Sequence, residues 1–96
     1  MSTEPNSRVR RRLIYQGRVQ GVGFRYTIAS TARRFPVTGY VKNLPDGNVE
    51  LVVDGKFAPI VAFLNEISVA FAGNIEKTLS EELDFEDAFH GFRILY

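Results

Sequence analysis

The spacing of hydrophobic residues changes several times along this chain, and the order of these changes restricts the fold more than any other feature. Residues 11–19 contain the aromatic and β-branched side chains typical of a strand, and Leu13, Tyr15 and Val19 share one parity. The spacing then lengthens to the period of a helix, in an apolar stripe formed by Phe24, Ile28, Ala32 and Phe35. Pro36 cannot continue a helix and disfavours helical backbone in the residue before it. The sequence therefore predicts a strand followed by a helix that ends near residue 35.

Residues 38–55 predict two strands around a tight turn. The turn is marked by Asp46-Gly47, a strong hairpin signal, and by Pro45, whose fixed φ suits the first position of a turn. Residues 49–54 alternate between two faces, as expected of a strand with one buried face. A second helix is expected from about residue 58 to Gly73 or Asn74, because apolar residues again recur at helical spacing: Ile60, Leu64, Ile67 and Phe71.

The remainder of the chain is expected to add two strands. Residues 74–80 predict a short strand, residues 81–88 an acidic loop, and residues 91–96 a final strand. The order of elements is then β-α-β-β-α-β with a short C-terminal strand. This order is typical of the α+β ferredoxin-like two-layer sandwich, in which an antiparallel sheet carries two helices on one face. We expect residues 1–8 to be a disordered lead-in and residues 9–96 to form a single domain.

Composition and charge argue against several classes of function. The 96 residues include no cysteine, which excludes disulfides and cysteine-ligated metals and favours a reducing, cytoplasmic location. The net charge of +1 gives little general attraction for nucleic acid, and no apolar run is long enough to span a membrane. We interpret a local basic cluster as the solvated start of the first strand rather than as a phosphate-binding arm: Arg8, Arg10, Arg11 and Arg12.

The loop between the first strand and the first helix is the main candidate for chemistry. Gly21 and Gly23 permit φ values at which successive backbone N–H groups converge on an anion, and the partial positive charge of the following helix adds to their field. The guanidinium of Arg25 can bind two oxygens of a phosphate or carboxylate at once. The alternative is that the glycines only make a tight turn and that Arg25 is a surface residue.

Three other features need an interpretation. Asn43, at the end of a predicted strand, can serve either the following turn or a water that attacks a bound phosphorus. His90 is the only histidine, and we interpret it as a loop or surface residue. The carboxylates between residues 76 and 87 lack the spacing of a calcium-binding loop and are interpreted as solvated. We therefore expect no metal and no protein nucleophile.

Two stretches of the chain resemble the signatures of the acylphosphatase family. Residues 17–25, GRVQGVGFR, match the pattern G-x-V-Q-G-V-x-[FM]-R. Residues 39–55, GYVKNLPDGNVELVVDG, match the pattern G-[FYW]-[AVC]-[KRQAM]-N-x3-G-x-V-x5-G. The resemblance covers essentially the whole chain. The segment after the second helix lacks the pattern common in relatives, so the register of the fourth strand stays open.

The resemblance implies hydrolysis of small acyl phosphates to a carboxylate and inorganic phosphate, with no metal and no cofactor. It implies that Arg25 binds the phosphate and that Asn43 orients the water. It also implies a phosphate cradle made by the backbone N–H groups of Gln20, Gly21, Val22, Gly23, Phe24 and Arg25. We expect a monomer that binds neither nucleic acid nor membrane. One alternative is a related non-catalytic module that binds anions without turnover or serves as a regulatory part of a larger assembly. Another is an RNA platform, which would need an exposed aromatic pattern that this sequence lacks.

Overall fold

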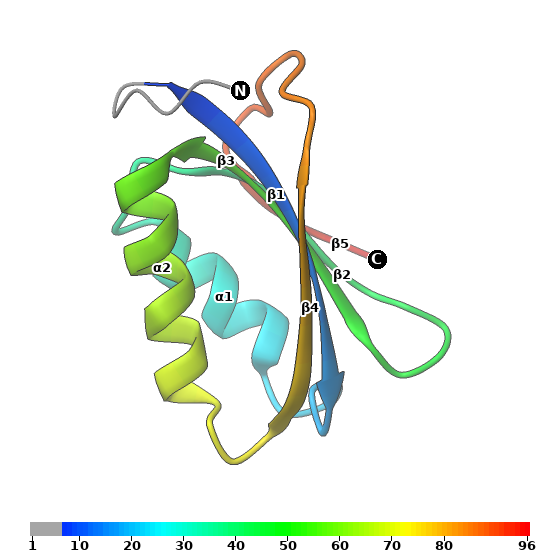
Figure 1. Cartoon of the computed structure of the whole chain (residues 1–96). Helices are drawn as coiled ribbons and strands as arrows, with labels where there is room; N and C mark the ends of the chain where they lie inside the picture. Colours follow the sequence, from blue (N-terminus) through cyan, green and yellow to red (C-terminus); the bar gives the residue numbers. More distant parts are fainter. Residues whose placement is uncertain (1–6) are drawn as a thin grey trace.

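A mixed sheet of five strands carries two helices on one face in the computed structural model, which describes residues 7–96 (Figure 1). The elements in chain order are β1 (Arg8–Gly17), α1 (Phe24–Ala32), β2 (Thr38–Asn43), β3 (Val49–Lys56), α2 (Phe57–Ala70), β4 (Ile75–Leu83) and β5 (Phe92–Leu95). This order confirms the predicted ferredoxin-like fold. Of the predicted lead-in, residues 1–6 lie outside the described residues, and Arg8 already belongs to β1. In residues 7–96, neither helix has the length and apolar character needed to cross a membrane.

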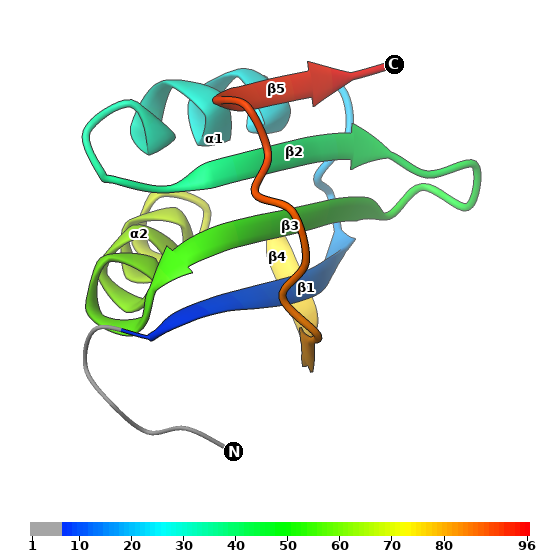
Figure 2. The same cartoon turned by 90° about the horizontal axis from the view of Figure 1, so that it is seen from above.

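The strands lie in the order β4-β1-β3-β2-β5. The pairs from β4 to β2 are antiparallel, as predicted, whereas β5 runs parallel to β2 with Phe92 opposite Gly39. The sheet is therefore mixed. Because β4 and β5 occupy opposite edges, the segment of residues 84–91 that joins them has to cross the sheet. Figure 2 shows this segment passing over β1, β3 and β2 on the face that the helices leave open.

The hydrophobic core lies between the helices and one face of the sheet. Leu13 and Tyr15 of β1 face the helices and are buried, so the parity predicted for this strand is confirmed. The other large buried side chains of this layer include Phe24, Ile28, Val41, Leu51, Ile60, Phe63 and Ile67. Full burial of one such side chain contributes about 1.5–3 kcal/mol, so this single layer is sufficient to hold both helices on the sheet.

The first helix is shorter than predicted. It ends at Ala32 rather than near Phe35. The next backbone N–H groups bond three residues back instead of four: Arg33 to Ser30, Arg34 to Thr31 and Phe35 to Ala32. Pro36 explains the difference, because it has no N–H to continue the helix and disfavours helical backbone in Phe35, so the last turn tightens.

The fourth strand is longer than predicted, so the acidic loop begins later in the chain than residue 81, where the sequence predicts its start. Glu81 and Glu82 belong to β4 and face the basic residues of β1. Arg12 Nη1 lies 3.1 Å from Glu81 Oε2, and Arg11 Nη1 lies 3.7 Å from Glu82 Oε1. Opposite charges across neighbouring strands favour pairing. Arg11 and Arg12 of the basic cluster therefore pair with carboxylates of the sheet and are not simply solvated, in contrast to the interpretation from the sequence.

Candidate active site

The loop between β1 and α1 owes its shape to two glycines. Gly21 and Gly23 both have φ of +77°. A Cβ added at either position would meet no atom within 4 Å, so packing does not demand glycine there. The left-handed backbone requires glycine, because that conformation costs other residues about 1–2 kcal/mol. The carbonyl of Gly23 accepts the N–H of Thr27 at 3.0 Å, and the helix therefore begins directly after the loop.

This loop presents backbone donors that the fold does not use. Among the described residues, none accepts a hydrogen bond from the backbone N–H groups of residues 21–25. Some of these groups belong to the first turn of α1, where N–H groups have no partner within the helix and carry its partial positive charge. The loop is therefore suited to hold an anion.

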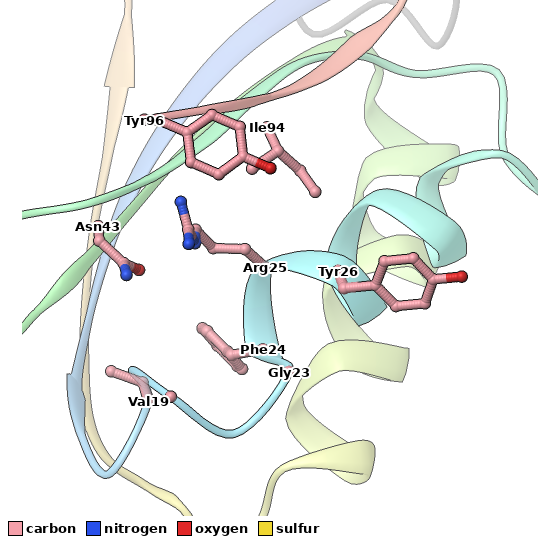
Figure 3. A pocket seen from close by; sticks show the side chains of 9 residues that line it. Val19, Gly23, Phe24, Arg25, Tyr26, Asn43, Ile94 and Tyr96 are labelled. Carbon is pink, nitrogen blue, oxygen red and sulfur yellow. The ribbon is translucent and has the colours of Figure 1, made fainter.

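Arg25, on the first turn of α1, is half-buried and is held from the far end of the chain. Its Nη1 donates to the carbonyl oxygen of Leu95 at 3.1 Å. Its guanidinium carbon lies 4.9 Å from the ring centroid of Tyr96, and Figure 3 shows that ring above the guanidinium. Within residues 7–96, Arg25 forms no ion pair with a carboxylate. The side chain is thus fixed at one edge while its charge stays available.

Asn43 is the last residue of β2, and its Oδ1 is buried without a hydrogen-bond partner among the described residues. The following turn does not depend on it. That turn is closed by Leu44 N–H to the Asn48 carbonyl at 2.9 Å and by Asn48 N–H to Asp46 Oδ1 at 3.0 Å. A buried, unpaired amide oxygen is costly unless something else satisfies it. The geometry therefore favours the water-binding alternative over the turn.

The side chain of Gln20 joins the glycine loop to the hairpin that carries Asn43. Its Nε2 donates to the carbonyl oxygens of Leu44 at 2.9 Å and of Asn48 at 2.8 Å. The sequence pointed only to the backbone N–H of this residue. The role of its side chain was missed because both partners lie in a turn far along the chain.

Arg25 and Asn43 meet in one cavity of about 200 Å³, into which both side chains point (Figure 3). The cavity is lined by Val19, Gly21, Gly23, Phe24, Arg25, Tyr26, Asn43, Ile94 and Tyr96. The contribution of β5 was not predicted. The alternation of residues 91–96 indicated a strand, but not that it would lie beside β2 at the cavity. The structure also places the single histidine of the sequence. His90 is exposed in a loop, as interpreted from the sequence. Within residues 7–96, no three acidic or histidine side chains are grouped so that they could hold a metal ion.

Comparisons with known proteins find relatives in sequence and in overall fold. The sequence model of the family described as Acylphosphatase matches residues 11–94. The chain is 42% identical to an acylphosphatase of Clostridium beijerinckii over 85 residues, which is 84% of this chain and 94% of that one. It is 50% identical to an acylphosphatase of Trichormus variabilis over 93 residues, 97% of this chain and 92% of that one. The crystal structure of acylphosphatase from Bacillus subtilis superposes with a TM-score of 0.82 at 30% identity, covering 92% of this chain and 99% of that chain.

Proposed function

We propose roles for the site residues from the premise that this chain belongs to the acylphosphatase family and hydrolyses acyl phosphates. In this proposal, Arg25 and the glycine loop bind the phosphoryl group, and Asn43 orients the attacking water. One observation carries the proposal. A half-buried guanidinium with no carboxylate partner shares a small cavity with a buried amide oxygen that has no hydrogen-bond partner in residues 7–96. The first can hold an anion, and the second can accept a hydrogen bond from a water.

In the proposed reaction, the phosphoryl oxygens accept hydrogen bonds from the loop N–H groups and from the free edge of the Arg25 guanidinium. A water held by Asn43 Oδ1 then attacks phosphorus. The new P–O bond forms as the bond between phosphorus and the carboxyl oxygen breaks, and the carboxylate leaves with that electron pair. One proton of the water passes to a phosphoryl oxygen and the other stays on the attacking oxygen, so the products are a carboxylate and inorganic phosphate.

The small number of side chains is consistent with this chemistry. An acyl phosphate has a good leaving group, so the enzyme has to hold the phosphoryl group, stabilise its charge and place a water in line. Positioning and electrostatic stabilisation are the main contributions of proteins to phosphoryl transfer. The proposed steps use neither a protein base nor a metal ion.

The role of Arg25 is tested by Arg25→Lys, with phosphate release from benzoyl phosphate measured in the presence of EDTA. Lysine keeps the charge but loses the planar fork that binds two oxygens. We expect kcat/KM to fall by about 100-fold or more, the effect of removing one transition-state donor. Arg33→Lys is the matched control, because Arg33 is exposed at the end of α1. Near-normal activity of Arg25→Lys would contradict the proposal, and abolition of the wild-type activity by EDTA would contradict the metal-free mechanism.

The role of Asn43 is tested in the same assay with Asn43→Ala, using the exposed Asn65→Ala as its control. A residue that orients water affects the chemical step more than phosphate binding. We therefore expect kcat to fall by about 100-fold, the effect of a misplaced reactant, while inhibition by inorganic phosphate changes little. Equal losses in kcat and in phosphate inhibition would mean that Asn43 only supports the loop.

We further propose that the enzyme acts as a monomer in the cytoplasm. All residues of the candidate site come from one chain, and a chain without cysteine suits a reducing compartment. Sedimentation of the active enzyme at assay concentrations tests the first point, and fractionation of the cells that produce it tests the second.

A further inference from the structure

We propose that Arg10 is a positioning residue that acts on Arg25 from the opposite face of the sheet. The connection runs through residues 84–91, which cross the open face between β4 and β5 and which we call the strap (Figure 2). The inference rests on the proposed role of Arg25 as the phosphate ligand. It is built from three sets of contacts: those that fix Arg10, those that join Arg10 to the strap, and those that join the strap to Arg25.

Arg10 is fixed by a buried carboxylate. Its Nε and Nη2 donate to the two oxygens of Asp54 at 2.6 and 2.7 Å. Asp54 is 0% exposed and is the only charged side chain within residues 7–96 that is fully buried. Two parallel bonds from a planar fork to a carboxylate fix orientation as well as distance. The planar guanidinium of Arg10 therefore has a fixed position and orientation on the open face of the sheet.

The strap contacts the guanidinium of Arg10 through its backbone and through two aromatic rings. Arg10 Nη2 also donates to the carbonyl oxygen of Asp87 at 2.9 Å. The guanidinium carbon lies 4.4 Å from the ring centroid of Phe89 and 5.6 Å from that of Phe85. Phe89 is held further by the ring of Tyr40, edge-on at 5.7 Å. One arginine thus contacts both aromatic rings of the strap and its backbone, by cation–π attraction and a charge-assisted hydrogen bond.

The strap leads directly into β5. The carbonyl oxygen of Gly91 accepts the N–H of Gly39 at 3.0 Å, at the point where the strap ends beside β2. β5 is a short edge strand, bonded along one side only. Its placement along β2 is set by this pairing, by Phe92 and Ile94 packed against the core, and by the segment that enters it. The carbonyl oxygen of Leu95, at its far end, is the acceptor that orients Arg25. When the strap is released from Arg10, the Leu95 carbonyl becomes less fixed in position, and the Arg25 guanidinium that bonds it becomes less fixed as well.

The inference is tested with Phe89→Ala and Arg10→Lys. Phe89→Ala removes the ring that stacks on Arg10 but keeps the Arg10–Asp54 pair, so no buried charge is left alone. Arg10→Lys keeps a charge beside Asp54 but loses the planar fork. Phe57→Ala is the matched control, because Phe57 is an exposed phenylalanine at the start of α2 and, within residues 7–96, makes no ring or cation–π contact with the strap. Urea unfolding establishes that each variant is fully folded under the assay conditions.

Three quantities are measured: hydrogen exchange of residues 84–91, the NMR resonance of the Arg25 side-chain Nε–H, and the inhibition constant of inorganic phosphate. We expect faster exchange in the strap, a shifted Arg25 resonance and an inhibition constant raised about threefold to tenfold in both strap variants, since small misplacements weaken a positioned group. The Phe57→Ala control should show none of these changes.

An unmoved Arg25 resonance, whether or not the strap exchanges faster, overturns the inference. A shift of this resonance confined to the strap variants supports it, and does so without reference to catalysis. If the resonance shifts while the phosphate constant stays unchanged, the positioning stands and the proposed phosphate-binding role of Arg25 is contradicted. The two proposals therefore fail in distinguishable ways.

Discussion

Replacing Gln20 by leucine should loosen the hairpin that carries Asn43 while leaving Arg25 in place. In the structure, Gln20 Nε2 donates to the carbonyl oxygens of Leu44 and Asn48 at 2.9 and 2.8 Å. Leucine has a similar size and no donor, so the substitution removes both bonds and little else. Arg25 is oriented separately, by the Leu95 carbonyl.

The size of the effect depends on the hydrogen bonds that the two carbonyl oxygens still accept in the variant. The Leu44 carbonyl also accepts the N–H of Gly47 at 3.2 Å, and the Asn48 carbonyl also accepts the N–H of Leu44 at 2.9 Å. Neither oxygen is therefore left without a donor, and the larger cost of an orphaned polar group does not apply. Two net hydrogen bonds at about 0.5–1.5 kcal/mol each give a loss of about 1–3 kcal/mol in the free energy of unfolding.

Urea unfolding measures this loss, and phosphate release from benzoyl phosphate measures its effect on catalysis. Since the hairpin places Asn43, kcat should fall by about tenfold, with a smaller change in inhibition by inorganic phosphate. Gln16→Leu is the control, because Gln16 is half-buried in β1 and its side chain makes no hydrogen bond to another residue in 7–96. A loss of stability below about 0.5 kcal/mol together with an unchanged kcat would refute the reasoning.

Two further predictions concern stability. Gly39→Ala would place a Cβ 1.9 Å from the backbone oxygen of Val52, so it should cost about 3 kcal/mol, whereas Gly23→Ala meets open space and should cost only the left-handed backbone strain of about 1–2 kcal/mol. Equal urea midpoints for the two variants would contradict this. The ion pair with Arg34 lowers the pKa of Glu66, so its contribution to stability is present above the ordinary pKa of glutamate and is lost as the pH falls through the folded-state value. The stability difference between wild type and Glu66→Gln should therefore shrink in acid, and a difference that is independent of pH would count against the pairing.

The fold could be predicted from the sequence because its core signals are local. Alternation in β1 and β3, helical stripes in α1 and α2, and the Asp46-Gly47 turn each act over a few residues. The error in β4 arose because distant residues decide where this strand ends. β4 extends through Glu81 and Glu82 because arginines of β1 lie opposite them, and nothing within the acidic segment itself indicates a strand.

The candidate site divides in the same way. The glycine loop, Arg25 and Asn43 could be proposed from the sequence because the chemistry of each is contained in a short motif, and the structure brings them to one cavity. Their roles remain predictions that the experiments above address. The hydrogen bond from Arg25 to Leu95 joins residues 70 positions apart, and the Gln20 side chain bonds the turn between β2 and β3. No local pattern encodes contacts of this kind.

The strand order also governs how this chain must fold. Only β2 and β3 are neighbours through a tight turn, whereas the other adjacent pairs in residues 7–96 join distant segments, such as Tyr15 with Thr78. Closing long loops costs chain entropy before any contact compensates for it, so such topologies fold more slowly than helical bundles of the same length. The Arg25 guanidinium gains its carbonyl partner only when β5, the strand farthest along the chain, has joined β2. The orientation of Arg25 in a refolding chain therefore depends on a long-range closure, and not only on the formation of the helix on which Arg25 lies.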